Sequence, residues 1–130
     1  TADRVTVRNN EFHDTMRLRR PGQACITVDG PVDAARAERE RADLANHGIL
    51  IAGNTIAGGG GSALAANSVS GLTVDGNQIE RPAGPAIVLG IVHDTLLARN
   101  RCVPTATVTV SEPSRQQVKM TDNIGLEVSK

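Results

Sequence analysis

The sequence of 130 residues contains almost no aromatic side chains, with one Phe, no Trp and no Tyr. Carbohydrate-binding grooves commonly use an exposed aromatic ring as a platform, because a ring gives a large contact area at low entropy cost. We expect Phe12, the single aromatic residue, to point into the core. The composition therefore argues against a ligand site built on stacked rings.

The chain also lacks an excess of charge and long apolar runs. Its 14 Lys and Arg residues balance its 14 Asp and Glu residues, for a formal net charge of zero. A nucleic-acid or anionic-membrane partner calls for a basic patch, so we expect neither partner. No apolar run approaches the roughly 20 residues that a bilayer-spanning helix needs.

The most informative feature of the sequence is a strict repeat. Four asparagines follow one another at intervals of 23 residues, at Asn54, Asn77, Asn100 and Asn123. Apolar residues keep the same interval in three columns, which are Ile51, Val74, Leu97 and Met120; Ile49, Leu72 and Val118; and Ile56, Ile79 and Cys102. A fixed period of about 20–50 residues indicates a stacked-repeat protein, in which each repeat buries its apolar face against its neighbours.

The repeat extends toward the start of the chain when one insertion is allowed. Residues 5–12 align with residues 49–56 at an offset of 44, which places Asn10 in the asparagine column. Five rungs result, beginning near residues 5, 49, 72, 95 and 118. Apolar and polar residues alternate within them, as in strands. A second strand is expected in four rungs, at residues 26–28, 64–66, 87–89 and 108–110.

These features predict an all-β fold, a parallel β-helix of about five 23-residue rungs that forms a single domain over residues 1–130. Residues 31–46 form the insertion, expected to be an external loop or a short helix over Val32 to Ala45. Deletion of residues 33–45 is expected to be tolerated, because an external loop contributes little to the core.

The asparagine column has a structural explanation. The chain must turn sharply after each inward-facing strand, and Asn tolerates the left-handed region better than other residues that carry a Cβ. Gly53 and Gly76, which precede two of the asparagines, ease the same bend. The side-chain amides of Asn10, Asn54, Asn77, Asn100 and Asn123 are expected to hydrogen-bond along the coil as a ladder.

The two cysteines and three histidines show no compact metal-ligand spacing, so we expect no metal and no cofactor. Cys102 shares a column with Ile56 and Ile79 and is expected to be buried. Cys25 is expected to face outward, about three rungs away. That separation exceeds the reach of a disulfide, so both residues are predicted to remain thiols.

Two phrases carry a family resemblance, Gly48-Ile49-Leu50-Ile51-Ala52-Gly53-Asn54-Thr55-Ile56 and Gly71-Leu72-Thr73-Val74-Asp75-Gly76-Asn77-Gln78-Ile79. They resemble repeats of the right-handed parallel β-helix, or pectate-lyase-like, superfamily, many of whose members cleave or epimerise polysaccharides. Residues 62–70 are similar to late rungs of β-helix glycoside hydrolases. The resemblance implies a right-handed coil, a secreted location, and a polysaccharide or oligosaccharide partner.

Candidate site residues are few. Glycoside hydrolysis uses two carboxyl groups about 5 Å apart or roughly 6.5–9.5 Å apart. Asp75 is the one acid in the outward columns of the first strand, and it has no carboxylate partner in register. His47 and His93 lie two periods apart in one column with Ser70 between them, and Asp94 follows His93. These imidazoles could flank a ligand or could simply be exposed turn residues.

Two hypotheses follow from the sequence. In the first, the chain is the late-rung portion of a secreted, glycoside hydrolase-like protein whose main catalytic residues lie outside it. In the second, it is a non-catalytic scaffold or assembly module that associates end to end. No capping segment is recognisable at either end of the repeat, so each end is expected to pair with missing rungs or with another copy. Whether the chain itself catalyses a reaction is left open.

Overall fold

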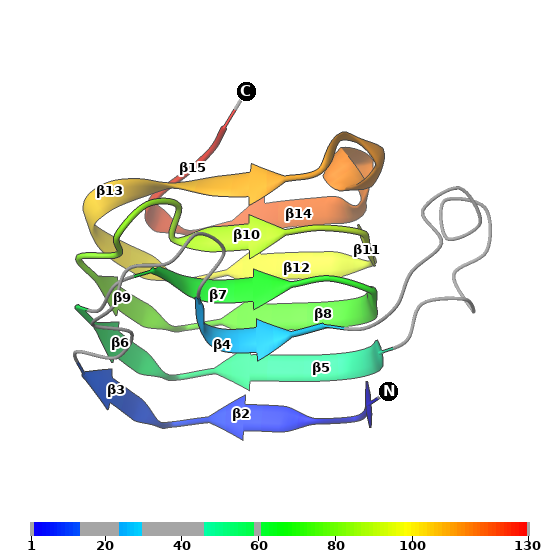
Figure 1. Ribbon diagram of the computed structural model, residues 1–130, viewed down its shortest axis with the longest axis horizontal. Helices are drawn as coiled ribbons and strands as arrows, with labels where there is room; N and C mark the ends of the chain where they lie inside the picture. The colour runs from blue at the N-terminus through cyan, green and yellow to red at the C-terminus, as the bar shows by residue number, and fades with distance from the viewer. Residues whose placement is uncertain (1, 14–23, 30–45, 59–60, 130) are drawn as a thin grey trace.

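The structure is a computed structural model that describes residues 2–13, 24–29, 46–58 and 61–129. The chain winds as a parallel β-solenoid, with its strands stacked as rungs from β2 at one end to β15 at the other (Figure 1). Every strand pairing among the described residues is parallel. The predicted fold class is therefore confirmed.

Two sheets form the walls of the coil. The first contains β1 (Ala2–Asp3), β2 (Thr6–Arg8), β5 (Asn46–Ala52), β8 (Val69–Asp75), β11 (Val92–His93), β12 (Thr95–Ala98) and β14 (Val118–Thr121). The second contains β3 (Glu11–His13), β4 (Ala24–Val28), β6 (Thr55–Ala57), β7 (Ser62–Ala66), β9 (Gln78–Glu80), β10 (Ile87–Leu89), β13 (Arg101–Val110) and β15 (Ile124–Val128).

The strand register reproduces the 23-residue period. Ile51 lies opposite Val74, which lies opposite Leu97, which lies opposite Met120. The offset of 44 is also present, since Val7 lies opposite Ile51. The second strands stack as predicted, with Ile87 between Leu64 and Val108.

Five rungs are present, as expected, but they do not all form complete turns of the coil. We number the rungs by their strands: rung 1 holds β1–β4, rung 2 β5–β7, rung 3 β8–β10, rung 4 β11–β13, and rung 5 β14 and β15. The coil amounts to about three complete turns. Rungs 3 and 4 are described without a gap, whereas residues 14–23 of rung 1 and residues 59–60 of rung 2 lie outside the described residues. A 3₁₀ helix, η2 (Glu112–Gln117), opens rung 5.

The core lies between the two sheets and is filled by the inward columns. Ile51, Val74 and Leu97 are at most 2% exposed. Burying a side chain of this size stabilises a fold by about 1.5–3 kcal/mol. Phe12 is partly buried and packs against this core, as expected.

The two cysteines do not form a disulfide, as predicted. Cys102 is buried in the column of Ile79, and its thiol donates to the Pro104 carbonyl oxygen at 3.3 Å. Burial raises the pKa of this thiol, because the thiolate would be poorly solvated there. Cys25, which was expected to face outward, is partly buried and packs against the core.

The expected insertion, residues 31–46, lies almost entirely outside the described residues, as does its expected helix; only Asn46, the first residue of β5, is described. The helix η2 was not anticipated. Its Ser114 hydroxyl accepts a hydrogen bond from the backbone N–H of Val92 at 3.0 Å, so the segment continues the stack above β11. Among the described residues, no helix has the length and apolar character to cross a membrane.

One structural explanation for the asparagine column was wrong. The left-handed residues are those immediately before the ladder asparagines, namely Asn9, Gly53, Gly76, Arg99 and Asp122, with φ between 53° and 65°. The ladder asparagines themselves do not have a positive φ. The bend therefore belongs to the preceding residue, which leaves each asparagine side chain pointing inward.

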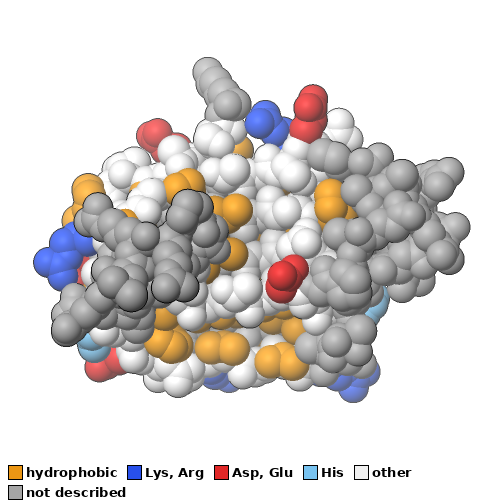
Figure 2. All heavy atoms as spheres, in the orientation of Figure 1, with side chains coloured by type: hydrophobic (Ala, Val, Ile, Leu, Met, Phe, Trp, Pro, Cys, Tyr) orange, Lys and Arg blue, Asp and Glu red, His pale blue; other side chains and the backbone are white. Residues whose placement is uncertain are grey.

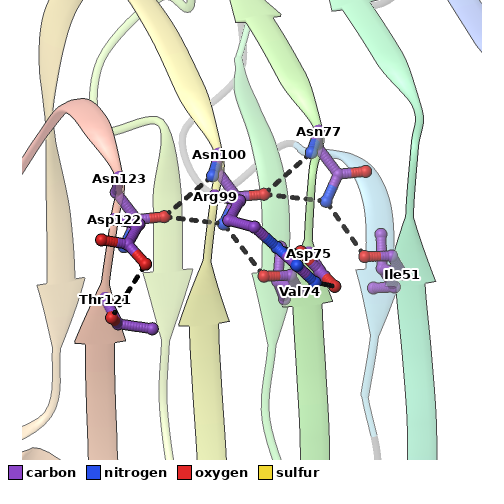
Figure 3. Close-up of polar contacts among 9 residues, drawn as sticks. All are labelled: Ile51, Val74, Asp75, Asn77, Arg99, Asn100, Thr121, Asp122 and Asn123. Atoms are coloured by element: carbon purple, nitrogen blue, oxygen red, sulfur yellow. Dashed lines mark hydrogen bonds and ion pairs between the residues drawn. The ribbon is translucent and has the colours of Figure 1, made fainter.

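The ladder itself is present (Figure 3). The Oδ1 atom of Asn77 accepts from the backbone N–H of Asn54 at 2.9 Å and from its Nδ2 at 3.0 Å. The Nδ2 of Asn77 donates to Asn100 Oδ1 and to the Ile51 carbonyl oxygen, both at 3.0 Å. Because buried polar groups are costly when unpaired, this ladder holds successive turns in register.

Candidate binding groove

The outer face of β9 and β13 carries a group of polar residues. Ile79 and Cys102 point into the core, so strand alternation turns their neighbours outward. Gln78 and Arg101 are directly paired across the two strands, as are Glu80 and Val103. Neighbouring rungs therefore place an amide, a carboxylate and a guanidinium side by side.

These residues line an open groove. Its volume is about 370 Å³, and its walls are formed by Gln78, Glu80, Arg81, Arg101, Val103 and Pro104. The Nε2 atom of Gln78 donates to Glu80 Oε1 at 3.0 Å, which orients both side chains. Val103 is half exposed and gives the groove an apolar wall.

Arg81 has an unusual backbone for a residue with a long side chain. Its φ is 51°, and Gly58, four residues after the ladder asparagine of the preceding rung, has a φ of 72°. A residue with a Cβ pays about 1–2 kcal/mol for the left-handed conformation. The Arg81 N–H donates to the Val103 carbonyl oxygen at 2.9 Å, a bond that Gly58 reproduces with Glu80. The coil therefore needs the backbone bend at this position but not the guanidinium.

The predicted site residue Asp75 lies on the outer face of the first sheet and is paired with Arg99 (Figure 3). The Nε of Arg99 donates to Asp75 Oδ1 at 2.8 Å, and a second, shorter bond joins Nη2 to Oδ2. The hydrogen bond from Arg99 lowers the pKa of the Asp75 carboxyl. Arg99, like Arg81, is left-handed at a position where the preceding rung carries a left-handed glycine. Asp75 is thus a fixed carboxylate on the structural corner of the coil.

The histidine column exists but does not form an open site. His47 and His93 both lie opposite Ser70. His93 is only 8% exposed, because η2 packs over β11. The interpretation of two exposed turn histidines is therefore wrong for His93.

Asp94, next in sequence, is exposed and left-handed, with a φ of 49°. Its backbone N–H donates to Gln117 Oε1 at 3.4 Å. It lines a separate hollow of about 360 Å³ with Thr95, Leu96, Gln116, Gln117, Val118 and Lys119. Neither Asp75 nor His47 is among the described residues that line this hollow.

The acids near the groove are widely spaced. Glu11 and Gln78 flank Thr55 in register, and Glu80 lies two residues beyond Gln78. Two strand spacings and two residue steps separate Glu11 from Glu80 by roughly 11–12 Å. These two backbone positions are therefore wider apart than the carboxyl groups of glycosidase pairs, which lie at most about 9.5 Å from each other. Among the described residues, no three His, Cys, Asp or Glu side chains gather as a metal-ligand set.

No family profile, no curated protein and no solved structure matches this chain. The groove residues were missed in the sequence because the outward columns considered there belonged to the first strand of each rung. Alternation about Ile79 and Cys102 would have identified Gln78, Glu80 and Arg101. The left-handed arginines could also have been found, since Arg81 and Arg99 occupy repeat positions held by Gly58 and Gly76.

Proposed function

We propose that this chain is a carbohydrate-binding β-solenoid module, and that the groove on β9 and β13 holds an oligosaccharide carrying carboxylate groups. The observation that supports the proposal is the pairing of two exposed arginines with an amide and a carboxylate along one open groove. A guanidinium donates two parallel hydrogen bonds to a carboxylate, so Arg81 and Arg101 suit uronate-type sugars.

The other groove residues suit the rest of a sugar. The Gln78 amide and the Glu80 carboxylate offer donors and acceptors for hydroxyl groups. Val103 and Pro104 offer an apolar surface for a ring face, in place of an aromatic platform. The groove is open rather than enclosed, so a polymer chain can lie along it and extend beyond both of its ends.

The proposal is binding and not cleavage. Glu11, the acid two rungs before Glu80 on this face, lies farther along the sheet than a catalytic pair would, so the groove would hold a glycan for a catalytic centre formed elsewhere in a glycoside hydrolase-like protein. A secreted location accompanies this proposal, because that is where most polysaccharides are met. The resemblance of the repeats to pectate-lyase-like proteins supports a polysaccharide ligand and a secreted location.

The test is a screen of acidic and neutral oligosaccharides, followed by calorimetry with the acidic glycan that binds. Two variants are matched, Arg81→Gly and Arg99→Gly. Each replaces a left-handed arginine by the glycine of a neighbouring rung and removes one positive charge, but only Arg81 lines the groove.

We expect Arg81→Gly to lose affinity at least about tenfold, the effect of a lost charge-assisted hydrogen bond of about 1.5–3 kcal/mol. The same variant should unfold at higher urea concentration, because glycine relieves a strain of about 1 kcal/mol. Arg99→Gly should leave affinity unchanged. Equal losses in both variants, or no binding of any acidic glycan by the wild-type chain, would contradict the proposal.

A further inference from the structure

The asparagine ladder has a direction. In each step the backbone N–H and the Nδ2 of one asparagine donate to the Oδ1 of the asparagine in the next rung, as Asn77 does to Asn100 at 3.0 Å in both bonds. Asn10 to Asn54 and Asn100 to Asn123 repeat this pattern. Donors therefore point toward the C-terminal end of the coil, and acceptors point toward the N-terminal end.

The two ends of the ladder are complementary. Asn123 uses its Nδ2 to donate to the Leu97 carbonyl oxygen at 2.8 Å. Within the described residues its backbone N–H and its second Nδ2 hydrogen donate to nothing. At the other end, the Nδ2 of Asn10 donates to Arg8 and Asn54, whereas its Oδ1 accepts nothing from the part of the chain that the structure describes. The Asn123 end of the ladder therefore offers hydrogen-bond donors, and the Asn10 end offers an acceptor.

The apolar columns also reach both ends. In rung 1, Val5 is 40% exposed and Val7 is partly buried against the core. In rung 5, Val118 and Met120 are partly buried and Val128 is 45% exposed. Figure 2 shows hydrophobic side chains in a row along the lower edge of the molecule, the end at which β2 lies in Figure 1. Among the described residues, β2 pairs only with β5, and β14 pairs only with β12.

Continuing the register by one rung matches these ends residue by residue. Val118 and Met120 would be followed by Val5 and Val7 of a second copy, since the columns of Ile49 and Ile51 contain these residues. Lys119 would face Thr6, Thr121 would face Arg8, and Asp122 would face Asn9. No like charges oppose each other among these matched residues of the first sheet, whereas like charges directly opposite would destabilise the joint.

We propose that copies of this chain stack head to tail, with rung 5 of one copy pairing with rung 1 of the next. Asn123 of the first copy donates to Asn10 Oδ1 of the second and so continues the ladder across the joint. Such an interface joins two different surfaces, so it leaves a free end at each step and produces linear assemblies. The proposal is independent of the groove, which lies on the side of the coil.

The polarity of stacking is tested by cross-linking Thr6→Cys protein with Lys119→Cys protein under mild oxidation. Residues in register on neighbouring strands are within disulfide reach. A mixture of the two variants should give a covalent dimer, whereas each variant alone, like the wild-type chain, should give little. The Thr73→Cys/Leu96→Cys chain is the positive control, because these residues are in register within one molecule. No dimer in the mixture, or an equal yield from Thr6→Cys alone, would overturn the proposal.

Sedimentation at rising protein concentration is the second test. Assemblies should grow with concentration beyond the dimer. Thr6→Lys should weaken association several-fold because it faces Lys119 of the neighbouring copy, and Thr6→Glu should strengthen it by a similar factor, on the scale of about 0.2–1 kcal/mol per cross-strand pair. Lys119→Glu combined with Thr6→Lys should restore the wild-type level. A monomer at all concentrations, or a dimer that does not grow, would contradict head-to-tail stacking.

Discussion

The middle and the outer rungs of this coil carry the same repeat, but their equivalent residues lie in different environments. Leu72 in rung 3 is 0% exposed, whereas Val5 at the same repeat position in rung 1 is 40% exposed. Asn77 is 3% exposed, whereas Asn10 is exposed. Each rung buries its apolar face only against its neighbours. The contribution of a residue to folding stability therefore depends on whether rungs cover it on both sides or on one side only. Stability should therefore be concentrated in rungs 2 to 4.

The largest effect expected from this difference comes from a charge placed in the core. Val74→Asp would bury an unpaired carboxylate between Ile51 and Leu97 and should abolish folding. Val5→Asp should cost about 1 kcal/mol or less in the monomer, because water still reaches the position. Circular dichroism and urea unfolding at low protein concentration would measure both. Similar losses in the two variants would show that the outer rung is as well packed as the middle.

A smaller effect is expected for the ladder. Asn77→Ala leaves the Asn54 N–H and the Ile51 carbonyl oxygen without their partners in a buried place, so we expect a loss of about 3 kcal/mol.

Asn10→Ala is the matched change at the end of the ladder. It removes one side-chain bond to Asn54, but the Asn10 backbone N–H still donates to Asn54 Oδ1 at 3.0 Å. The expected loss is about 0.5–1 kcal/mol. Chemical denaturation of both variants measures the difference. An Asn10→Ala loss as large as that of Asn77→Ala would refute the idea that the end of the ladder contributes little.

The smallest effect concerns the ion pair on the outer surface. Arg99 lowers the pKa of Asp75 below its ordinary value of 3.8, so the pair stabilises the fold above that pH and loses this contribution as the pH falls through the folded-state pKa. Wild type should exceed Asp75→Asn in stability at pH 6 by less than about 1 kcal/mol. This margin should shrink at pH 3 and in high salt. The exposed Glu127→Gln is the control, and a margin that does not change with pH would argue against the pair.

Arg81 and Arg99, two of the three left-handed arginines among the described residues, sharpen the comparison between structure and binding. At both repeat positions the preceding rung has a left-handed glycine, Gly58 for Arg81 and Gly76 for Arg99. Arg99 is compensated by a carboxylate in the preceding rung. Arg81 instead lines the open groove on β9 and β13.

The spacing of asparagines and apolar residues was sufficient to predict the coil, because residues can share a column only if the chain returns to the same place after 23 positions. The core columns followed from strand alternation for the same reason. The turn chemistry was less accessible, since an asparagine after a glycine is compatible with either residue being left-handed. The backbone dihedral angles assigned the bend to the preceding residue.

By itself, the sequence determined the architecture of this protein, the ladder and the buried columns, because all three follow from a 23-residue period that can be read from the order of residues along the chain. The tertiary structure alone decided that Arg99 meets Asp75, that η2 packs over the strand of His93, and that Gln78, Glu80, Arg81 and Arg101 line one groove. These contacts depend on turn geometry and side-chain direction across neighbouring rungs, which the spacing of residues along the chain does not contain.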